Sequence, residues 1–235
     1  MTKIQGRRGF IKHLAAATGG IVMAPALVSC GGSDLGGGQS VSAKQPAIQD
    51  ETTGKDIPLV RPADWDSIVF NRERGNAGAI PQSYIAEING PDGEIMHLGK
   101  HLPYVPQLNP DLVPEGYLPL MWGDAARGYA RHPNSPLGAK DYPRGHWYNW
   151  VRVRLATGED AEEVTSEFTG WPEPGTQDSG KYAVFGSGDI AADSGKNTIY
   201  LVALPSGVSP EDTIRIHAHC LYHGEYVDFL TTPQR

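Results

Sequence analysis

Beyond about Leu59 the chain alternates hydrophobic and polar residues over short stretches, with the period of two that is typical of β-strands. This alternation predicts strands over residues 147–155, 196–204 and 212–220, and further strands over 83–88 and 224–230. Clusters of Pro and Gly such as 91–93 and 172–175 separate these stretches and predict turns.

The predicted strands have faces of different character. Over 212–220, one face carries Ile214, Ile216, Ala218 and Cys220, and the other carries Thr213, Arg215, His217 and His219. Over 147–155, Val151 and Val153 fall on a mostly buried face, and Tyr148 falls on the opposite one.

Helical periodicity is scarce, and only residues 161–168 are expected to form one or two helical turns. Several short strands joined by Gly- and Pro-containing turns predict an all-β fold, specifically an immunoglobulin-like β-sandwich. The 29 Gly and 19 Pro residues are about a fifth of the 235 residues, while 39% are hydrophobic. The chain is therefore rich in loops but can still bury one core.

The first 29 residues have the layout of a secretory signal peptide, which is absent from the mature protein. Four basic residues and no acidic one precede a moderately apolar run over 14–28; the basic residues are Lys3, Arg7, Arg8 and Lys12. This region resembles a twin-arginine export signal, although Gly6 stands where Ser or Thr is usual. The alternative is an exposed basic helix packed on the domain.

The apolar run ends in Leu27-Val28-Ser29-Cys30, which resembles the lipobox of bacterial lipoproteins. The resemblance implies that Cys30 is lipidated and becomes the first mature residue of a periplasmic or cell-surface protein. No apolar run of about twenty residues is present, so we expect membrane contact through the lipid anchor only. The twin-arginine route carries folded cargo, which implies a metal or cofactor loaded before export.

Residues 30–58 contain few large apolar side chains, so burial cannot offset the entropy of ordering them. We expect a disordered tether over 30–58 and one folded domain over 59–235. Removal of residues 1–29 leaves 16 basic and 27 acidic residues, which changes the net charge from −7 to −11. This acidity argues against nucleic acid as a partner. The oligomeric state is left open, a homo-oligomer included.

The eight histidines and two cysteines are the candidates for chemistry. His13 belongs to the predicted signal peptide, and His97 has no partner pattern. His217 and His219 lie on the strand face opposite Cys220, where we expect a surface or interface role. Four histidines remain: His101, His132, His146 and His223. Two cysteines cannot build a four-Cys zinc site or a Cys-ligated iron–sulfur cluster.

Cys220 and His223 form a Cys-x-x-His pattern at the end of a predicted strand. The strand can deliver a thiolate, and the following turn can fold the imidazole back toward the same metal. Taken alone, the pattern fits a buried Cys beside an unrelated His equally well.

Three further histidine motifs precede this pattern. In order, the series reads Gly99-Lys100-His101-Leu102-Pro103-Tyr104-Val105, Arg131-His132-Pro133, Gly145-His146-Trp147 and Cys220-Leu221-Tyr222-His223-Gly224. The series resembles the superoxide reductase family, including the iron-binding domain of desulfoferrodoxin, over roughly residues 94–229.

In that family one iron is held by four equatorial histidine nitrogens and one axial cysteine sulfur. The resemblance implies that the equatorial ligands are His101, His132, His146 and His223, and that the axial ligand is Cys220. It also implies that superoxide is reduced to hydrogen peroxide by one electron from ferrous iron, which an unknown donor re-reduces. Imidazole and thiolate are ligands that suit iron.

The resemblance also assigns a catalytic role to Lys100, which would attract superoxide to the open face and organise proton delivery. A local cation is needed because a net charge of −11 repels the anion. The alternative is a solvated loop lysine. The family often has a Glu before this Lys; here Gly99 stands there, so another residue caps the ferric iron or none does. The segment from His132 to His146 is longer than usual.

Two other functions fit part of the pattern. A cupredoxin-like copper protein commonly has a Met after its second His, and no Met follows His223. A copper site of this kind would also leave His132 and His146 without a role as ligands. An iron-binding electron-transfer or sensing lipoprotein would keep all five ligands without reductase turnover, because a fold does not guarantee an activity. Four scattered histidines and a buried thiol remain the purely structural alternative.

Overall fold

The computed structural model describes residues 56–168, 182–184 and 192–234. The predicted signal peptide, Cys30 and nearly all of the predicted tether lie outside these ranges. Their assignments therefore stay predictions from sequence.

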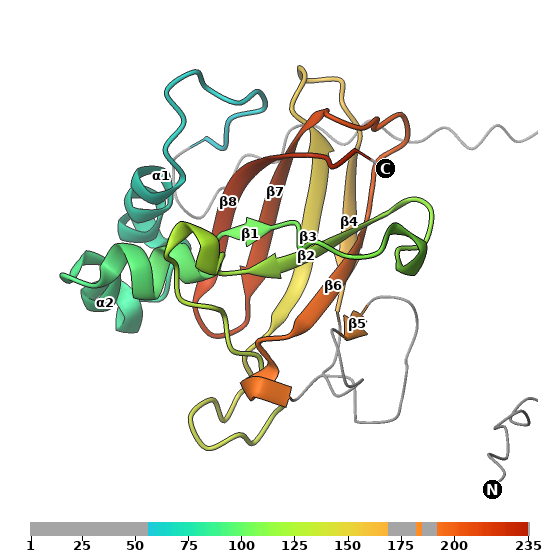
Figure 1. The fold of residues 1–235 in the computed structure, drawn as a ribbon. Helices are drawn as coiled ribbons and strands as arrows, with labels where there is room; N and C mark the ends of the chain where they lie inside the picture. Colours follow the sequence, from blue (N-terminus) through green and yellow to red (C-terminus); the bar gives the residue numbers. More distant parts are fainter. Residues whose placement is uncertain (1–55, 169–181, 185–191, 235) are drawn as a thin grey trace, which may run out of the picture. The chain divides into compact units, whose positions relative to one another are not determined.

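The described residues form two antiparallel four-stranded sheets with few helices (Figure 1), which is the architecture of a β-sandwich. One sheet has the strand order β1-β2-β6-β5, with bounds Pro103–Tyr104, Tyr117–Trp122, Thr198–Ala203 and Tyr182–Val184. The other has the order β4-β3-β7-β8, with bounds Glu163–Glu167, Tyr148–Leu155, Thr213–Cys220 and Gly224–Thr231. The immunoglobulin-like type of sandwich stays a prediction.

Alternate residues of four strands fill the space between the two sheets, as the period of two requires. This main core includes Leu118 and Leu120 of β2, Tyr200 and Val202 of β6, Val151 and Val153 of β3, and Ile214, Ile216, Ala218 and Cys220 of β7. Cys220 is the last residue of β7, so its sulfur lies where the core meets one end of the sandwich.

The strand predicted over 147–155 is present as β3, but one side chain points the other way from the prediction. Tyr148 is fully buried, because the pairing of β3 with β7 shifts register between Tyr148 and Trp150. Such a bulge adds a residue to one strand and turns its neighbours. Tyr148 therefore faces inward, against the predicted alternation.

The strand predicted over 83–88 is wrong. The chain there forms a 3-10 turn over Gln82–Tyr84 and helix α2 over Ile85–Asn89. Tyr84 and Ile88 are buried four residues apart in a second core cluster, while Ala86 is exposed. Burial at a spacing of four is helical, so the apparent alternation of 84, 86 and 88 was misleading.

The helical turns predicted over 161–168 are also wrong. Residues Glu163–Glu167 form β4, an edge strand paired with β3 through Val153↔Val164 and Arg152↔Thr165. Ser166 also accepts a hydrogen bond from the Ala203 N–H of β6 (2.9 Å). Partners distant in the sequence set the structure of this polar segment.

Helix α1, Ser67–Arg74, begins where the Asp66 side chain accepts hydrogen bonds from the N–H groups of Ile68 and Val69. The remaining one-turn helical segments are Gly75–Ala79, Gly93–Leu98, Gly99–His101, Pro110–Leu112, Ala125–Arg127 and Ala192–Gly195. None of the helices in the described ranges is both long and apolar enough to cross a membrane.

Helix α1 lies beside the edge strand β8 (Figure 1), and buried Asn71 joins the two. The Asn71 side chain donates to the Val227 carbonyl (2.7 Å) and accepts from the Val227 N–H (2.8 Å). It also donates to the Ser67 carbonyl within its own helix (2.7 Å). One amide group thus satisfies the edge of the sheet in place of another strand.

We expect Asn71→Ala to destabilise the metal-free protein by about 3 kcal/mol, because both polar backbone groups of buried Val227 lose their partner. Urea unfolding measures the change. Asn76→Ala is the control, because Asn76 is exposed and bonds only to Asn89 across the surface. Equal losses in the two variants would contradict the role of Asn71.

Candidate metal centre

The four histidines that remain as candidate ligands come together with Cys220 in one buried cluster. Their ligand atoms all lie within 4.8 Å of one another, and each residue is at most 3% exposed. The members are His101, His132, His146, Cys220 and His223. Residues spread over more than half of the described chain therefore face a single point.

Three members are positioned by neighbouring elements. His101 ends the turn Gly99–His101, and one residue, Leu102, separates it from β1. Cys220 ends β7, and His223 lies in the turn between β7 and β8. The Cys-x-x-His pattern thus spans a strand end and the following turn, as predicted from its spacing.

The long segment from His132 to His146 is held closed at its base. The His132 N–H donates to the Trp122 carbonyl at the end of β2 (3.1 Å). Ser135 and His146 exchange two backbone hydrogen bonds of 2.9 and 3.0 Å, just before β3 begins. These hydrogen bonds fix both histidines in the cluster, although the segment between them is unusually long.

The proton positions of the rings follow from their contacts. His101 Nδ1 lies 2.6 Å from the His97 carbonyl, so it carries a proton and leaves His101 Nε2 as a lone pair. That Nε2 is 3.0 Å from His223 Nδ1, and His146 Nε2 is 2.9 Å from the same atom. Since one nitrogen carries at most one proton, the two contacts cannot both be full hydrogen bonds. Protein groups alone therefore leave this cluster incompletely satisfied.

A metal ion would satisfy the cluster. Nitrogens about 2.1 Å from one ion and at right angles to each other are about 3 Å apart, as these ring nitrogens are. The Cys220 sulfur lies 3.6 Å from His132 Nε2 and 3.8 Å from His223 Nδ1. Imidazole and thiolate together suit iron, copper, zinc and related transition metals. The residues present thus fit a metal of this group.

Burial keeps the imidazoles neutral, which is the form that binds metal. It lowers the pKa of His146 to about 3 and the pKa of His223 to about 2. Burial likewise lowers the pKa values of His101 and His132 well below the usual range, and neighbouring imidazoles and Lys100 add to the effect.

Burial raises the pKa of Cys220 to about 12, so without a metal its sulfur stays a thiol at neutral pH. The backbone N–H groups of Tyr222 and His223 and the charge of Lys100 oppose this shift. All three would stabilise a thiolate, the form in which cysteine ligates metals.

Aromatic rings enclose the cluster, and each imidazole contacts a tyrosine. The ring centroid distances are 4.3 Å for His101–Tyr226, 4.9 Å for His132–Tyr148, 4.1 Å for His146–Tyr142 and 4.0 Å for His223–Tyr84. These contacts fix ring orientations and exclude water. The sequence motifs indicate none of these tyrosines, because all four lie outside the histidine motifs.

Lys100 reaches toward the cluster from its neighbour His101. Its ammonium lies 5.5 Å from the centroid of the Tyr84 ring, which itself packs on His223. Burial lowers the pKa of Lys100 to about 8, and a thiolate at Cys220 would oppose this shift. Lys100 also lines a cavity of about 650 Å³, together with Arg131 and Lys196. Three basic residues and one acidic residue, Asp92, line this cavity, and the neighbour of Lys100 in the sequence, His101, belongs to the cluster.

A steric contact explains why the residue before Lys100 is a glycine. A Cβ atom at Gly99 would lie 2.2 Å from Cδ1 of Tyr129. Because real Cβ atoms do not approach that closely, any side chain at this position would displace the Tyr129 ring. No carboxylate can therefore stand before Lys100 in this arrangement.

Three histidines outside the cluster have structural partners. His217 is buried, and its Nε2 lies 2.9 Å from a Glu225 oxygen, so the expected surface role is wrong for this residue. His219 is half-buried and bonds to Asn149. His97 bonds to the Tyr84 hydroxyl (2.7 Å) and holds His101 through its carbonyl. In the sequence, the contact between His97 and His101 was indicated by their separation of four residues.

The comparisons with known proteins return no relative: no family model, no curated protein and no solved structure matches the chain.

We expect the metal-free protein to bind one transition-metal ion per chain and to gain about 2.7 kcal/mol of stability when free metal is a hundred times its Kd. His146→Ala should lose most of this gain, because it removes one of five ligand atoms. Differential scanning calorimetry with Co²⁺ measures the gain. His219→Ala is the matched control, and an equal loss in that variant would contradict the ligand assignment.

Proposed function

We propose that this chain is a mononuclear non-haem iron protein that reduces superoxide to hydrogen peroxide. The observation that carries the proposal is the buried cluster of four imidazoles and one cysteine. The motifs around these residues follow the order of the superoxide reductase family, which uses this donor set for iron. We further propose export as a twin-arginine lipoprotein, lipidated at Cys30 and placed outside the cytoplasm, on the N-terminal motifs alone.

Bound ferrous iron would supply the single electron that, with two protons, converts superoxide to hydrogen peroxide and leaves the iron ferric. The four imidazoles and Cys220 would hold the ion at one place. Lys100 would attract the superoxide anion through the cavity that it lines with Arg131 and Lys196.

One hydrogen bond and one ring contact lead from this cavity toward the cluster. His97 lines the cavity, and its ring bonds to the Tyr84 hydroxyl. Tyr84 in turn packs on His223. Tyr84 and His97 could therefore hold a proton between Oη and Nδ1 near the reacting anion, beside the Lys100 ammonium.

Gly99 removes one element of the family pattern. With Tyr129 packed against it, the carboxylate that often caps the ferric iron has no place. We propose that the ferric site of this chain is capped by a small molecule or by none, since the enclosing tyrosines already limit access.

The other two functions make different demands on the cluster. A type 1 copper site uses two histidines and one cysteine, whereas here His132 and His146 lie with the others among the five. An iron-binding electron-transfer or sensing protein would use the same five ligands, and Gly99 leaves room for that function. Reaction with superoxide separates it from a reductase.

We expect the iron-loaded ferrous protein to react with pulse-generated superoxide close to the diffusion limit, and Cys220→Ser to lose both this reaction and the thiolate-to-iron absorption of the ferric state. Pulse radiolysis and optical spectra measure the two effects. An unreactive ferrous protein would leave only electron transfer or sensing. An intense thiolate-to-copper band with weak iron uptake would contradict the iron assignment.

We expect Lys100→Met to slow the reaction with superoxide about tenfold and to weaken its dependence on ionic strength, because it removes the local cation but keeps the apolar stem. Iron content should not change, since Lys100 supplies no ligand atom. Lys140→Met is the control, because Lys140 is an exposed lysine of the segment between His132 and His146. Equal rates for the two variants would rule out the role of Lys100.

A further inference from the structure

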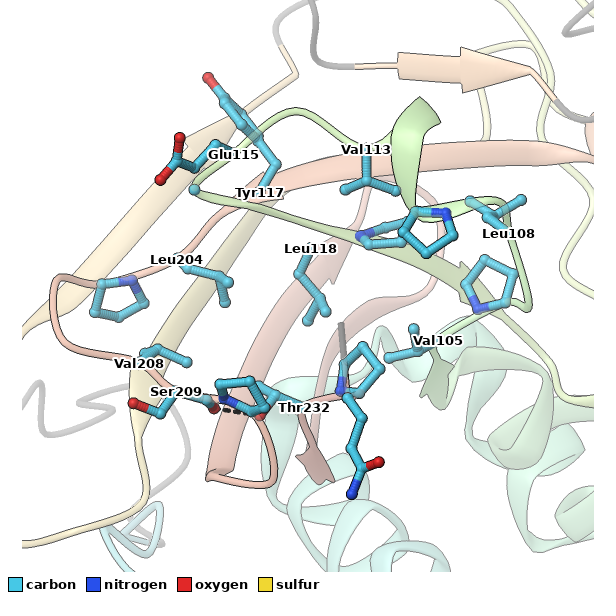
Figure 2. Close-up of a pocket in the computed structure, with 18 of the residues that line it drawn as sticks. Val105, Leu108, Val113, Glu115, Tyr117, Leu118, Leu204, Val208, Ser209 and Thr232 are labelled. Atoms are coloured by element: carbon cyan, nitrogen blue, oxygen red, sulfur yellow. Dashed lines mark hydrogen bonds between the residues drawn. The ribbon is translucent and has the colours of Figure 1, made fainter.

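Figure 2 shows a second cavity, of about 680 Å³. It lies toward the end of β7 that is opposite to Cys220 of the metal cluster. Its walls come from residues 105–119, from the loop after β6 and from the chain after β8. β7 begins near this loop, at Thr213, and ends at the other side, at Cys220. None of the five clustered residues lines this cavity.

The walls are aliphatic and stiff. Val105, Leu108, Val113, Leu204 and Val208 are grouped around the space (Figure 2). Val105, Leu204 and Val208 also pack on the main core, so the cavity is a recess in that core. Six prolines also line the cavity: Pro106, Pro110, Pro119, Pro205, Pro210 and Pro233. Proline fixes its backbone and lacks an N–H group, so these walls are preformed and poor in donors.

Two hydroxyl groups of the lining are already hydrogen-bonded, and its charged side chain has the wrong charge for an anion. Thr232 donates to the Ser209 carbonyl (2.7 Å), and Ser206 donates to a Glu162 carboxylate oxygen (2.6 Å). Among the described residues that line the cavity there is no Lys, Arg or His, and Glu115 is the charged one. A bound carboxylate or phosphate would thus meet no cation among these residues, and side-chain donors such as those of Gln107 and Ser209 are exposed to water.

We propose that this cavity binds a neutral, largely aliphatic small molecule, such as an alkyl or isoprenoid chain without a negative head group. Its volume lies within the range of about 300–1,000 Å³ that is usual for small-molecule sites. The charge of the lining selects against anionic amphiphiles of the same length. The proposal is independent of the metal chemistry, because the two sites share no residue.

The test uses the full mature chain and the neutral fluorophore N-phenyl-1-naphthylamine, whose emission rises in apolar sites. We expect saturable binding of one probe per chain, displaced by 1-decanol at a concentration at least about tenfold lower than by decanoate. Equal displacement by the two compounds, or the absence of saturable binding, would overturn the proposal.

Two variants locate the probe. Val208→Trp fills the half-buried wall and should abolish the fluorescence rise, whereas Leu137→Trp changes an aliphatic side chain that is 69% exposed outside the cavity and should not. Glu115→Arg should lower the concentration of decanoate that displaces the probe, so that it comes close to the concentration of 1-decanol that does so. Urea unfolding confirms that each variant is folded. If Val208→Trp binds the probe as Leu137→Trp does, the cavity is no small-molecule site. The same conclusion follows if the sole effect of Val208→Trp is to dissociate a dimer, as measured by analytical ultracentrifugation.

Discussion

Five potential ligand atoms face one buried point, and their lone pairs repel one another unless a cation or shared protons stand between them. Burial removes the option of protonating the rings, because it lowers the pKa values of the imidazoles. Hydrogen bonds can relieve only part of the repulsion, since His101 Nε2 and His146 Nε2 compete for one nitrogen of His223. The protein must therefore hold these rings by other means, and the rest of the fold provides them.

The sandwich holds the rings at one of its ends. β2, β3 and β7 all contribute there: Trp122 holds the backbone of His132, His146 lies just before β3, and Cys220 ends β7. Tyrosines from separate segments stack on the imidazoles, and α1 with Asn71 completes the edge of the neighbouring strand. Rigid neighbours can keep like lone pairs close together because no single ring is free to turn away.

The part of this architecture that depends on local pattern could be predicted from the sequence. β3, β6, β7 and β8 follow from alternation, and the five clustered residues follow from their ordered motifs. The segment over 83–88 was mistaken because Tyr84 and Ile88 satisfy periods of two and four alike. Contacts between distant residues gave no signal: Tyr129 against Gly99, and Asn71 against Val227, follow only from the folded chain. The helical turns predicted over 161–168 were wrong for the same reason, since the pairing of β4 with β3 outweighs local preference.

The sulfur of Cys220 belongs to the hydrophobic core as well as to the cluster, and none of its surface is exposed. Thiolates exposed to peroxide are oxidised to sulfenic and then to sulfinic acids, and both access and ionisation set the rate. A ligated sulfur is ionised, so access alone protects it. A protein that made peroxide at this cluster would release it on the side of Lys100, while the packed core shields the sulfur. The durability of the centre under its own product would then depend on how tightly the sandwich closes around β7.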